Sequence, residues 1–193
     1  MNCNKKQVTF TNSTLTKNNQ INMEANKPNI GKFSLIYGSI AGVVGIVFSF
    51  MLISLDMLYD QGSGKTIVSI AILIGAVILG IFNFRKENGS LTLKQALKIG
   101  TGSSVIAAIY SILFTLALVN FIEPDFIAKT GEITRAAMIE SNPTISNEQL
   151  DMVTEQQAKF FWVAYPFMLI FNAFGGLIIG LLGGLILKKD AQA

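Results

Sequence analysis

The chain lacks histidine altogether, and its 193 residues include a single cysteine. The absence of histidine excludes imidazole acid–base catalysis and histidine-ligated metal sites, and one cysteine excludes a disulfide framework. Charge is also scarce, because Asp, Glu, Lys and Arg make up 14% of the residues, whereas a soluble domain carries about a quarter. Hydrophobic residues make up 51%. This composition predicts a membrane protein.

Uncharged apolar stretches occur four times along the chain, at residues 33–55, 67–84, 99–122 and 160–187. An α-helix rises ~1.5 Å per residue and the hydrocarbon layer of a bilayer is ~30 Å thick, so each stretch is close to the length that crosses it. The sequence therefore predicts an all-α polytopic membrane protein. We expect a four-transmembrane-helix bundle with a short helical extracytoplasmic cap formed by residues 123–159.

Lysine and arginine are distributed unevenly between the segments that join these stretches. Residues 1–32 carry a net charge of +4, residues 85–98 carry +3 and residues 188–193 carry +1. Residues 56–66 and 123–159 carry −1 and −4. Because cytoplasmic loops hold an excess of Lys and Arg, we expect both termini in the cytoplasm and the 123–159 loop outside.

The first 32 residues are rich in Asn, Thr and Lys and have few apolar side chains. We therefore expect residues 1–32 to form a disordered cytoplasmic tail, followed by a membrane domain over residues 33–189. Met23 lies shortly before the first apolar stretch, so both Met1 and Met23 are candidate translation start sites.

Small residues recur at four-residue intervals within the apolar stretches, a pattern that lets transmembrane helices approach closely. In the fourth stretch, three glycines and an amide lie on one such stripe, at Asn172, Gly176, Gly180 and Gly184. In the first stretch, the pair is Gly38 and Gly42. We expect these residues to pack the four helices against one another. A homodimer across the fourth helix is the alternative.

An amide and a proline stand out in the fourth stretch. Asn172 lies near its middle, where an unpaired amide is costly, so its side chain is expected to face protein and to hydrogen-bond to a serine or a carbonyl. Pro166 removes a backbone hydrogen bond and is expected to kink the helix. A substrate site at these two residues is the alternative, although no charged residue lies within the four stretches, and ion-coupled transporters generally place charges there.

Two sequence patterns in the connecting segments predict where helices begin. Thr92 with Gln95, and Ser146 with Gln149, match the capping box, in which the first side chain accepts from the backbone three residues on and the second side chain accepts in return. The first pair is expected to open the helix of the third stretch. The second pair is expected to open a helix within the 123–159 loop.

The 123–159 loop is long enough to form its own helices. Its pattern predicts one helix over about 124–140, a break at 142–143 and a second helix from 146 that runs into the fourth stretch. Both helices are expected to rest on the membrane surface or on the ends of the bundle.

Charged residues cluster at two places outside the spans. Glu148, Asp151 and Glu155 share one face of the second loop helix, and we expect a solvated acidic face, because hard-cation sites use convergent ligands from a defined loop. A basic cluster is expected at the headgroup level on the cytoplasmic side, in contact with anionic lipid or a partner. Its members are Arg85, Lys86, Lys94 and Lys98.

Residues around the second and third stretches resemble a known family. They are Arg85, Gly89, Leu91, Thr92, Leu93, Ala96, Leu97 and Gly100, then Ile122, Pro124, Asp125 and Phe126. The pattern resembles the small inner-membrane proteins grouped as domain of unknown function 4199, over about residues 31–189, although Glu123 stands where that family often has Asp and Leu93 where it usually has Phe. The resemblance implies a four-span bundle with cytoplasmic ends in the bacterial inner membrane. It implies no activity.

The function expected from the sequence is noncatalytic. We expect no catalytic residue, cofactor or metal, and no nucleic-acid partner. The leading hypothesis is a structural or interaction component of the cytoplasmic membrane, in contact with membrane lipid and with either a second copy or an unidentified membrane protein. The alternative is a small-solute channel or transporter that uses Asn172, Pro166 and the serines of the first and third stretches.

Overall fold

The computed structural model describes residues 28–60 and 62–188, which are helical apart from short connections. The helices are α2 (Ile30–Ser54), α3 (Ser63–Asn88), α4 (Leu93–Ala117), the π-helix η1 (Leu118–Ile122), α5 (Phe126–Ser141), α6 (Asn147–Phe160), the 3-10 helix η2 (Phe161–Val163) and α7 (Ala164–Leu187). Four helical segments, containing α2, α3, α4 and α7, are long and apolar enough to cross a membrane. The predicted all-α fold with four spans is thereby confirmed.

Most of the long helices begin before the apolar stretches that predicted them. The Asn29 side chain accepts a hydrogen bond from the backbone N–H of Gly31 at 2.8 Å, so α2 begins at Ile30 and the last three residues of the expected disordered tail are helical. Residues 1–27, including both candidate translation starts, lie outside the described residues.

Capping determines the ends of α3 and the start of α4. α3 continues through Arg85 and Lys86, whose positive charges are favourable in the last turn of a helix, and it stops at Gly89, which has a left-handed φ of 72°. The predicted capping box of Thr92 and Gln95 is present and opens α4 six residues before the apolar stretch.

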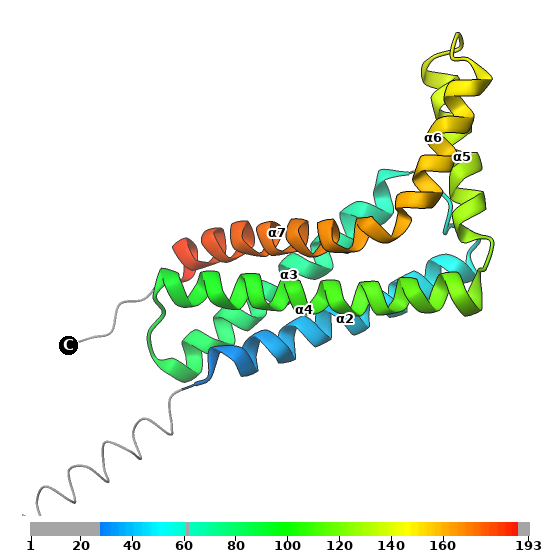
Figure 1. Cartoon of the computed structure of the whole chain (residues 1–193). Helices are drawn as coiled ribbons and strands as arrows, with labels where there is room; N and C mark the ends of the chain where they lie inside the picture. Colours follow the sequence, from blue (N-terminus) through cyan, green and yellow to red (C-terminus); the bar gives the residue numbers. More distant parts are fainter. Residues whose placement is uncertain (1–27, 61, 189–193) are drawn as a thin grey trace, which may run out of the picture.

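The four long helices lie side by side, as Figure 1 shows. α4 packs between α2 and α7, and α3 contacts all three. The α3–α4 connection and the described ends of the chain lie at one end of the bundle, which we call the basic end. The α2–α3 connection and the helices α5 and α6 lie at the opposite end, which we call the hairpin end.

Most of the buried core lies in one half of the bundle, although Leu118 and Val119 of η1 are buried at the hairpin end. Buried residues fall within 33–42 of α2, 76–84 of α3, 96–108 of α4 and 176–184 of α7, which in each helix is the half nearer the basic end or the turn at its centre. Leu91 of the α3–α4 connection is fully buried and packs against this core at the basic end. The packing that fixes the bundle is therefore concentrated at the basic end.

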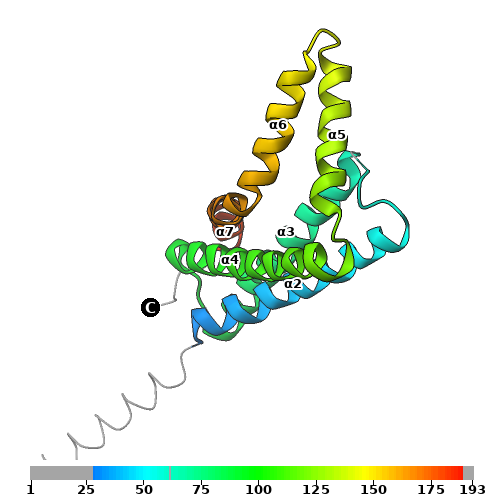
Figure 2. The same cartoon turned by 45° about the vertical axis from the view of Figure 1, so that its right-hand side comes forward.

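Helices α5 and α6 form an antiparallel hairpin that stands away from the bundle at a steep angle (Figure 2). The two predicted loop helices are thus confirmed, and α6 begins with the predicted capping box of Ser146 and Gln149. They project away from the ends of the spans and do not lie along them as expected, because α5 and α6 pack chiefly on each other. The chain turns from α6 into α7 through η2. Pro166 lies in the first turn of α7, where backbone N–H groups lack partners in a regular helix, so the proline is tolerated one turn after the bend.

Candidate functional site

A cavity of about 430 Å³ lies between the four spans in the hairpin half of the bundle. It reaches from Leu58 and Phe126 at the hairpin end to Ala41 and Ala107 near the middle of α2 and α4. The 11 residue steps from Ala41 to Leu52 on its α2 wall correspond to a depth of ~16 Å at the helical rise. Small-molecule sites in proteins have volumes of ~300–1,000 Å³, so the cavity is large enough to hold a ligand.

Differences in backbone spacing along the bundle create the cavity. At the basic end the helices touch, since a Cβ atom added to Gly38 would lie 2.6 Å from the Ser103 carbonyl oxygen, and one added to Gly176 would lie 2.5 Å from that of Gly100. Toward the hairpin end the contact is lost, and a Cβ atom added to Gly45 would meet nothing within 4 Å. Side chains on this wall, such as Ser49, are too small to fill the space that remains.

The cavity wall is uncharged but not wholly apolar. Twelve of the 17 lining residues are apolar or glycine, and five carry a hydroxyl or an amide. Each of the four hydroxyls donates to the carbonyl one turn earlier in its own helix. The donor–acceptor pairs are Ser49 to Gly45 at 3.0 Å, Ser69 to Lys65 at 2.9 Å, Ser111 to Ala107 at 3.2 Å and Thr115 to Ser111 at 2.9 Å.

Asn172 is the fifth polar residue of the cavity wall. Its Nδ2 donates to the Met168 carbonyl of the same helix at 2.9 Å. One N–H of the amide and the Oδ1 acceptor are not used by this bond. Asn172 therefore belongs to the cavity wall, whereas the three glycines that follow it on the stripe pack against α4.

An aromatic cluster lies above the cavity at the hairpin end. Phe126, which lines the cavity, packs against Tyr59 with 5.9 Å between ring centroids and against Phe161 with 6.4 Å. Phe161 also contacts Trp162 and Tyr165. These rings connect the α2–α3 connection, α5 and η2, so they pack the base of the hairpin against the hairpin end of the bundle.

A charged pair beside this cluster alters two pKa values. Glu123 forms an ion pair with Lys129, whose Nζ lies 5.6 Å from the centroid of the Tyr59 ring. Burial raises the pKa of Tyr59, and the negative charge of Glu123 raises it further, while Lys129 lowers it. The hydrogen bond to Glu123 raises the pKa of Lys129. At neutral pH both groups therefore stay protonated.

The predicted packing glycines lie at helix contacts within the chain. Gly38 faces Ser103 and Ile106, and Gly42 faces the ring of Tyr110. The three glycines of α7 face α4 at close range. They are Gly176, Gly180 and Gly184. The glycine stripe of α7 is thus covered by α4 of the same chain.

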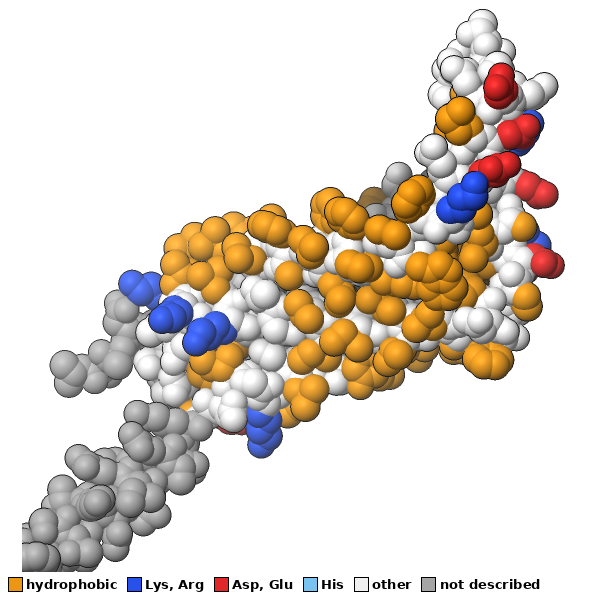
Figure 3. Space-filling view, in the orientation of Figure 1, with side chains coloured by type: hydrophobic (Ala, Val, Ile, Leu, Met, Phe, Trp, Pro, Cys, Tyr) orange, Lys and Arg blue, Asp and Glu red, His pale blue; other side chains and the backbone are white. Residues whose placement is uncertain are grey.

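The four predicted basic residues gather at the basic end, where Figure 3 shows lysine and arginine side chains. Arg85 and Lys86 lie in the last turn of α3 and, with Phe82 and Gly89, border an open groove of about 260 Å³. Lys94 and Lys98 lie in the first two turns of α4. All four therefore lie in one region of the molecule, at the basic end of the bundle.

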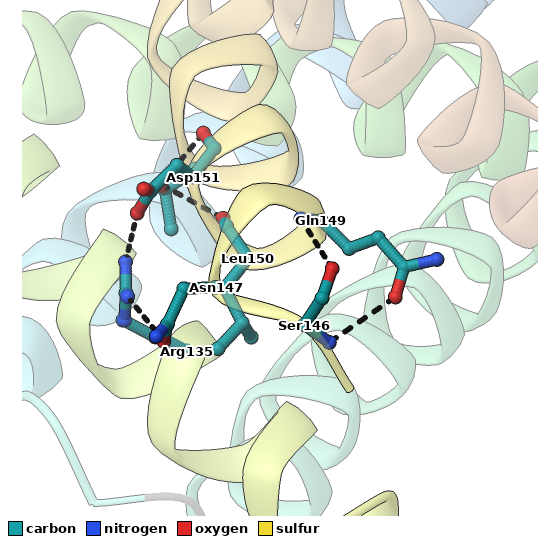
Figure 4. Close-up of polar contacts among 7 residues, drawn as sticks. Arg135, Ser146, Asn147, Gln149, Leu150 and Asp151 are labelled. Carbon is teal, nitrogen blue, oxygen red and sulfur yellow. Dashed lines mark hydrogen bonds and ion pairs between the residues drawn. The ribbon is translucent and has the colours of Figure 1, made fainter. Parts of the chain in front are cut away.

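The predicted acidic face lies on the hairpin and is used in part by ion pairs. Arg135 of α5 donates to Asp151 of α6, and also to Asn147 at 3.3 Å (Figure 4). Glu155 pairs with Lys159 at 3.3 Å. Within residues 28–60 and 62–188 no group of three or more acidic, cysteine or histidine side chains could hold a metal ion.

Several cavity residues were not predicted from the sequence. Ser69 and Thr115 carry two of the five polar groups, and Leu58 and Phe126 form the top of the cavity. The spacing of Ser111 and Thr115, one turn apart, is a signal that places both on one face of α4. No local signal places Ser69 or Phe126, because each reaches the cavity through the packing of separate helices.

Four apolar spans, charges confined to the connections and ends of the spans, and an uncharged cavity between the spans define a multi-pass membrane protein. The chain belongs to the family described as protein of unknown function (DUF4199), whose model matches residues 36–189. This confirms the resemblance seen in the sequence. No curated protein and no solved structure matches the chain.

Proposed function

We propose that the protein is a noncatalytic component of the bacterial cytoplasmic membrane, and that the α5–α6 hairpin is the surface through which it binds a partner outside the cytoplasm. The observation that carries the proposal is the position of the hairpin. α5 and α6 pack chiefly on each other and stand away from the spans, so their outer faces are uncovered.

The orientation in this proposal follows from the charges at the two ends. Lysine and arginine gather at the basic end, whereas acidic side chains line the hairpin, and apolar side chains cover the bundle between them (Figure 3). The positive-inside rule then favours a cytoplasmic basic end. The basic groove beside Arg85 and Lys86 would meet anionic headgroups of the inner leaflet.

The chemistry of the hairpin favours a partner with a basic outer segment. Glu148, Asp151 and Glu155 border one open depression on α6, and residues 123–159 carry a net charge of −4. Opposite charges steer association and fix orientation more than they add affinity. A second copy of the chain would have to use the hairpin or another face, because the glycine stripe of α7 is covered by α4.

Site-specific photocrosslinking in intact cells tests this proposal. A photoreactive residue at Met152 of α6, which is 55% exposed, is expected to give a discrete adduct. The matched control is Ile186, which is 81% exposed and lies in the apolar helix α7. The joint substitution Glu148→Gln and Glu155→Gln is expected to weaken the adduct several-fold. The proposal fails if Met152 gives no adduct or the same adducts as Ile186.

A channel or transporter for a small solute is the second candidate, and the cavity between the spans favours it. A conducting path would also need an opening through the basic half, where Gly180 lies so close to α4 that an added Cβ would be 2.8 Å from the Ala96 carbonyl oxygen. Solute flux into vesicles that contain the protein, abolished by Asn172→Leu, would favour this function over the first.

A further inference from the structure

We propose that the cavity between the four spans is a binding site for an uncharged amphiphile that carries hydroxyl or N–H hydrogen-bond donors on an apolar body. The inference concerns the interior of the bundle and does not depend on the role of the hairpin. It rests on the contribution of all four spans to the cavity wall, on the absence of charge from its 17 lining residues and on the state of its five polar groups.

The absence of charge restricts the ligand to neutral molecules. A charged group that moved from water into this cavity would lose its hydration and meet no charged side chain in return. The apolar residues, which form most of the wall, favour hydrocarbon. An ion or a strongly polar solute therefore fits poorly, and a molecule with an apolar body fits well.

The five polar groups specify the hydrogen-bonding character of the ligand. Each hydroxyl proton is already donated to a helix carbonyl, so the hydroxyl oxygens present only lone pairs to the cavity. Asn172 adds the acceptor Oδ1 and one spare N–H. Acceptors thus outnumber donors on the wall, and a ligand that donates hydrogen bonds is favoured over one that only accepts them.

Photoaffinity labelling of the full chain in detergent tests the site, with a photoreactive monoacylglycerol as the probe. The matched control probe is the methyl ester of the same photoreactive fatty acid, which has the same chain but no donor. We expect the monoacylglycerol to label peptides that contain cavity residues, such as Phe114 or Met168, at least tenfold more than the ester does. Equal labelling by both probes, or labelling spread over lipid-facing residues, would overturn the proposal.

Two glycine substitutions distinguish the cavity from the membrane-facing surface. Gly45→Leu adds a side chain where a Cβ meets nothing within 4 Å, on the cavity wall, whereas Gly75→Leu adds the same side chain where a Cβ also meets nothing but outside the cavity. We expect Gly45→Leu to reduce labelling at least tenfold and Gly75→Leu to leave it unchanged. Unchanged labelling of a folded Gly45→Leu variant would contradict the site.

A second variant, which lacks two polar groups of the cavity wall, serves if thermal unfolding shows that Gly45→Leu does not fold. Asn172→Leu combined with Ser111→Ala removes two acceptors of the wall and is expected to bring labelling by the monoacylglycerol down to that by the ester. If the preference for the donor-bearing probe survives, the proposal is wrong. Competition by free glycerol, which has no apolar body, would contradict the proposal, whereas competition by unlabelled monoacylglycerol but not by glycerol would support it.

Discussion

At the scale of single residues, two neighbouring glycines of α7 have opposite surroundings. A Cβ atom on Gly176 would lie 2.4 Å from the Ser104 hydroxyl and 2.5 Å from the Gly100 carbonyl oxygen, whereas one on Gly175 would meet nothing within 4 Å. The contact with the Gly100 carbonyl oxygen involves backbone of α4, so it can be relieved only if α4 and α7 move apart. Close approach of these two helices therefore depends on the absence of a side chain at Gly176.

We predict that Gly176→Ala lowers the free energy of unfolding by ~1–3 kcal/mol, the usual cost of overpacking. Gly175→Ala is the matched control, and it should be neutral or slightly stabilising, because alanine favours a helix over glycine by up to ~1 kcal/mol. Equilibrium unfolding of both variants in detergent measures the difference. Equal stabilities would mean that the two helices separate easily.

The Tyr59 hydroxyl gives a second prediction at this scale. Its pKa is raised by burial and by Glu123 and is lowered by Lys129. Glu123→Gln should therefore lower the pKa of Tyr59 toward its ordinary value of 10.0, and Lys129→Met should raise it further. Ultraviolet titration of tyrosinate, with the Tyr59→Phe chain subtracted, measures both shifts.

The same shift predicts a dependence of stability on pH. A raised pKa in the folded chain means that the folded state favours the protonated phenol. Its contribution to stability is complete below the ordinary pKa and is lost as the pH rises through the raised value. In the titration of the two variants, pKa shifts of Tyr59 with the same sign in Glu123→Gln and Lys129→Met would show that the two charges do not act on Tyr59.

At the scale of helices, the structure separates features that the sequence predicts well from those that it does not. The capping boxes of Thr92 and Ser146 involve residues three apart, so their hydrogen bonds follow from local sequence. The rotation of each helix about its axis depends on contacts with other helices. For this reason the joint position of Ser49, Ser69 and Asn172 around one cavity is not determined by any one stretch of sequence.

Helix α6 gives a prediction at this scale, because its start depends on Ser146. We expect Ser146→Ala to destabilise the first turn of α6 by ~1 kcal/mol, which corresponds to a roughly fivefold faster hydrogen exchange of its amides. Ser141→Ala is the control, since the Ser141 hydroxyl only donates to the Met138 carbonyl at the end of α5.

Hydrogen exchange also reports whether the hairpin is independent of the bundle. Amides of the buried segments 76–84 and 96–108 should exchange at unchanged rates in the Ser146→Ala chain, because α5 and α6 pack chiefly on each other. Faster exchange in those segments would indicate that the hairpin and the bundle unfold together. Together with the crosslinking at Met152, this measurement decides whether the hairpin is a separate binding element.

At the scale of the whole molecule, the apolar stretches and the charge distribution predicted the four spans, and the structure confirms them. The sequence did not predict that most of the burial within the spans lies in the half nearer the basic end. Gly38 and Gly45 both belong to series of small residues at four-residue intervals in α2. Of these two glycines, only Gly38 is in close contact with α4. That difference arises from the angles between helices, which are set by the sum of many packing contacts.

The orientation in the membrane gives a prediction for the whole chain. In a Cys3→Ser background, Glu87→Cys at the basic end should be labelled by an impermeant thiol reagent only from the cytoplasmic side. Ser141→Cys at the tip of the hairpin should be labelled only from outside. Both positions are exposed, so labelling reports sidedness. The reverse pattern would invert the proposed topology.

The uneven packing of the bundle has a consequence for its response to pressure. Tightly packed protein interiors are nearly incompressible, whereas internal voids make a folded state sensitive to hydrostatic pressure. Here the dense core lies in the basic half, and the cavity of about 430 Å³ lies in the hairpin half. Compression would therefore act mainly on the hairpin half of the bundle, where it would draw α2, α3 and α7 toward α4. The basic half would keep its shape.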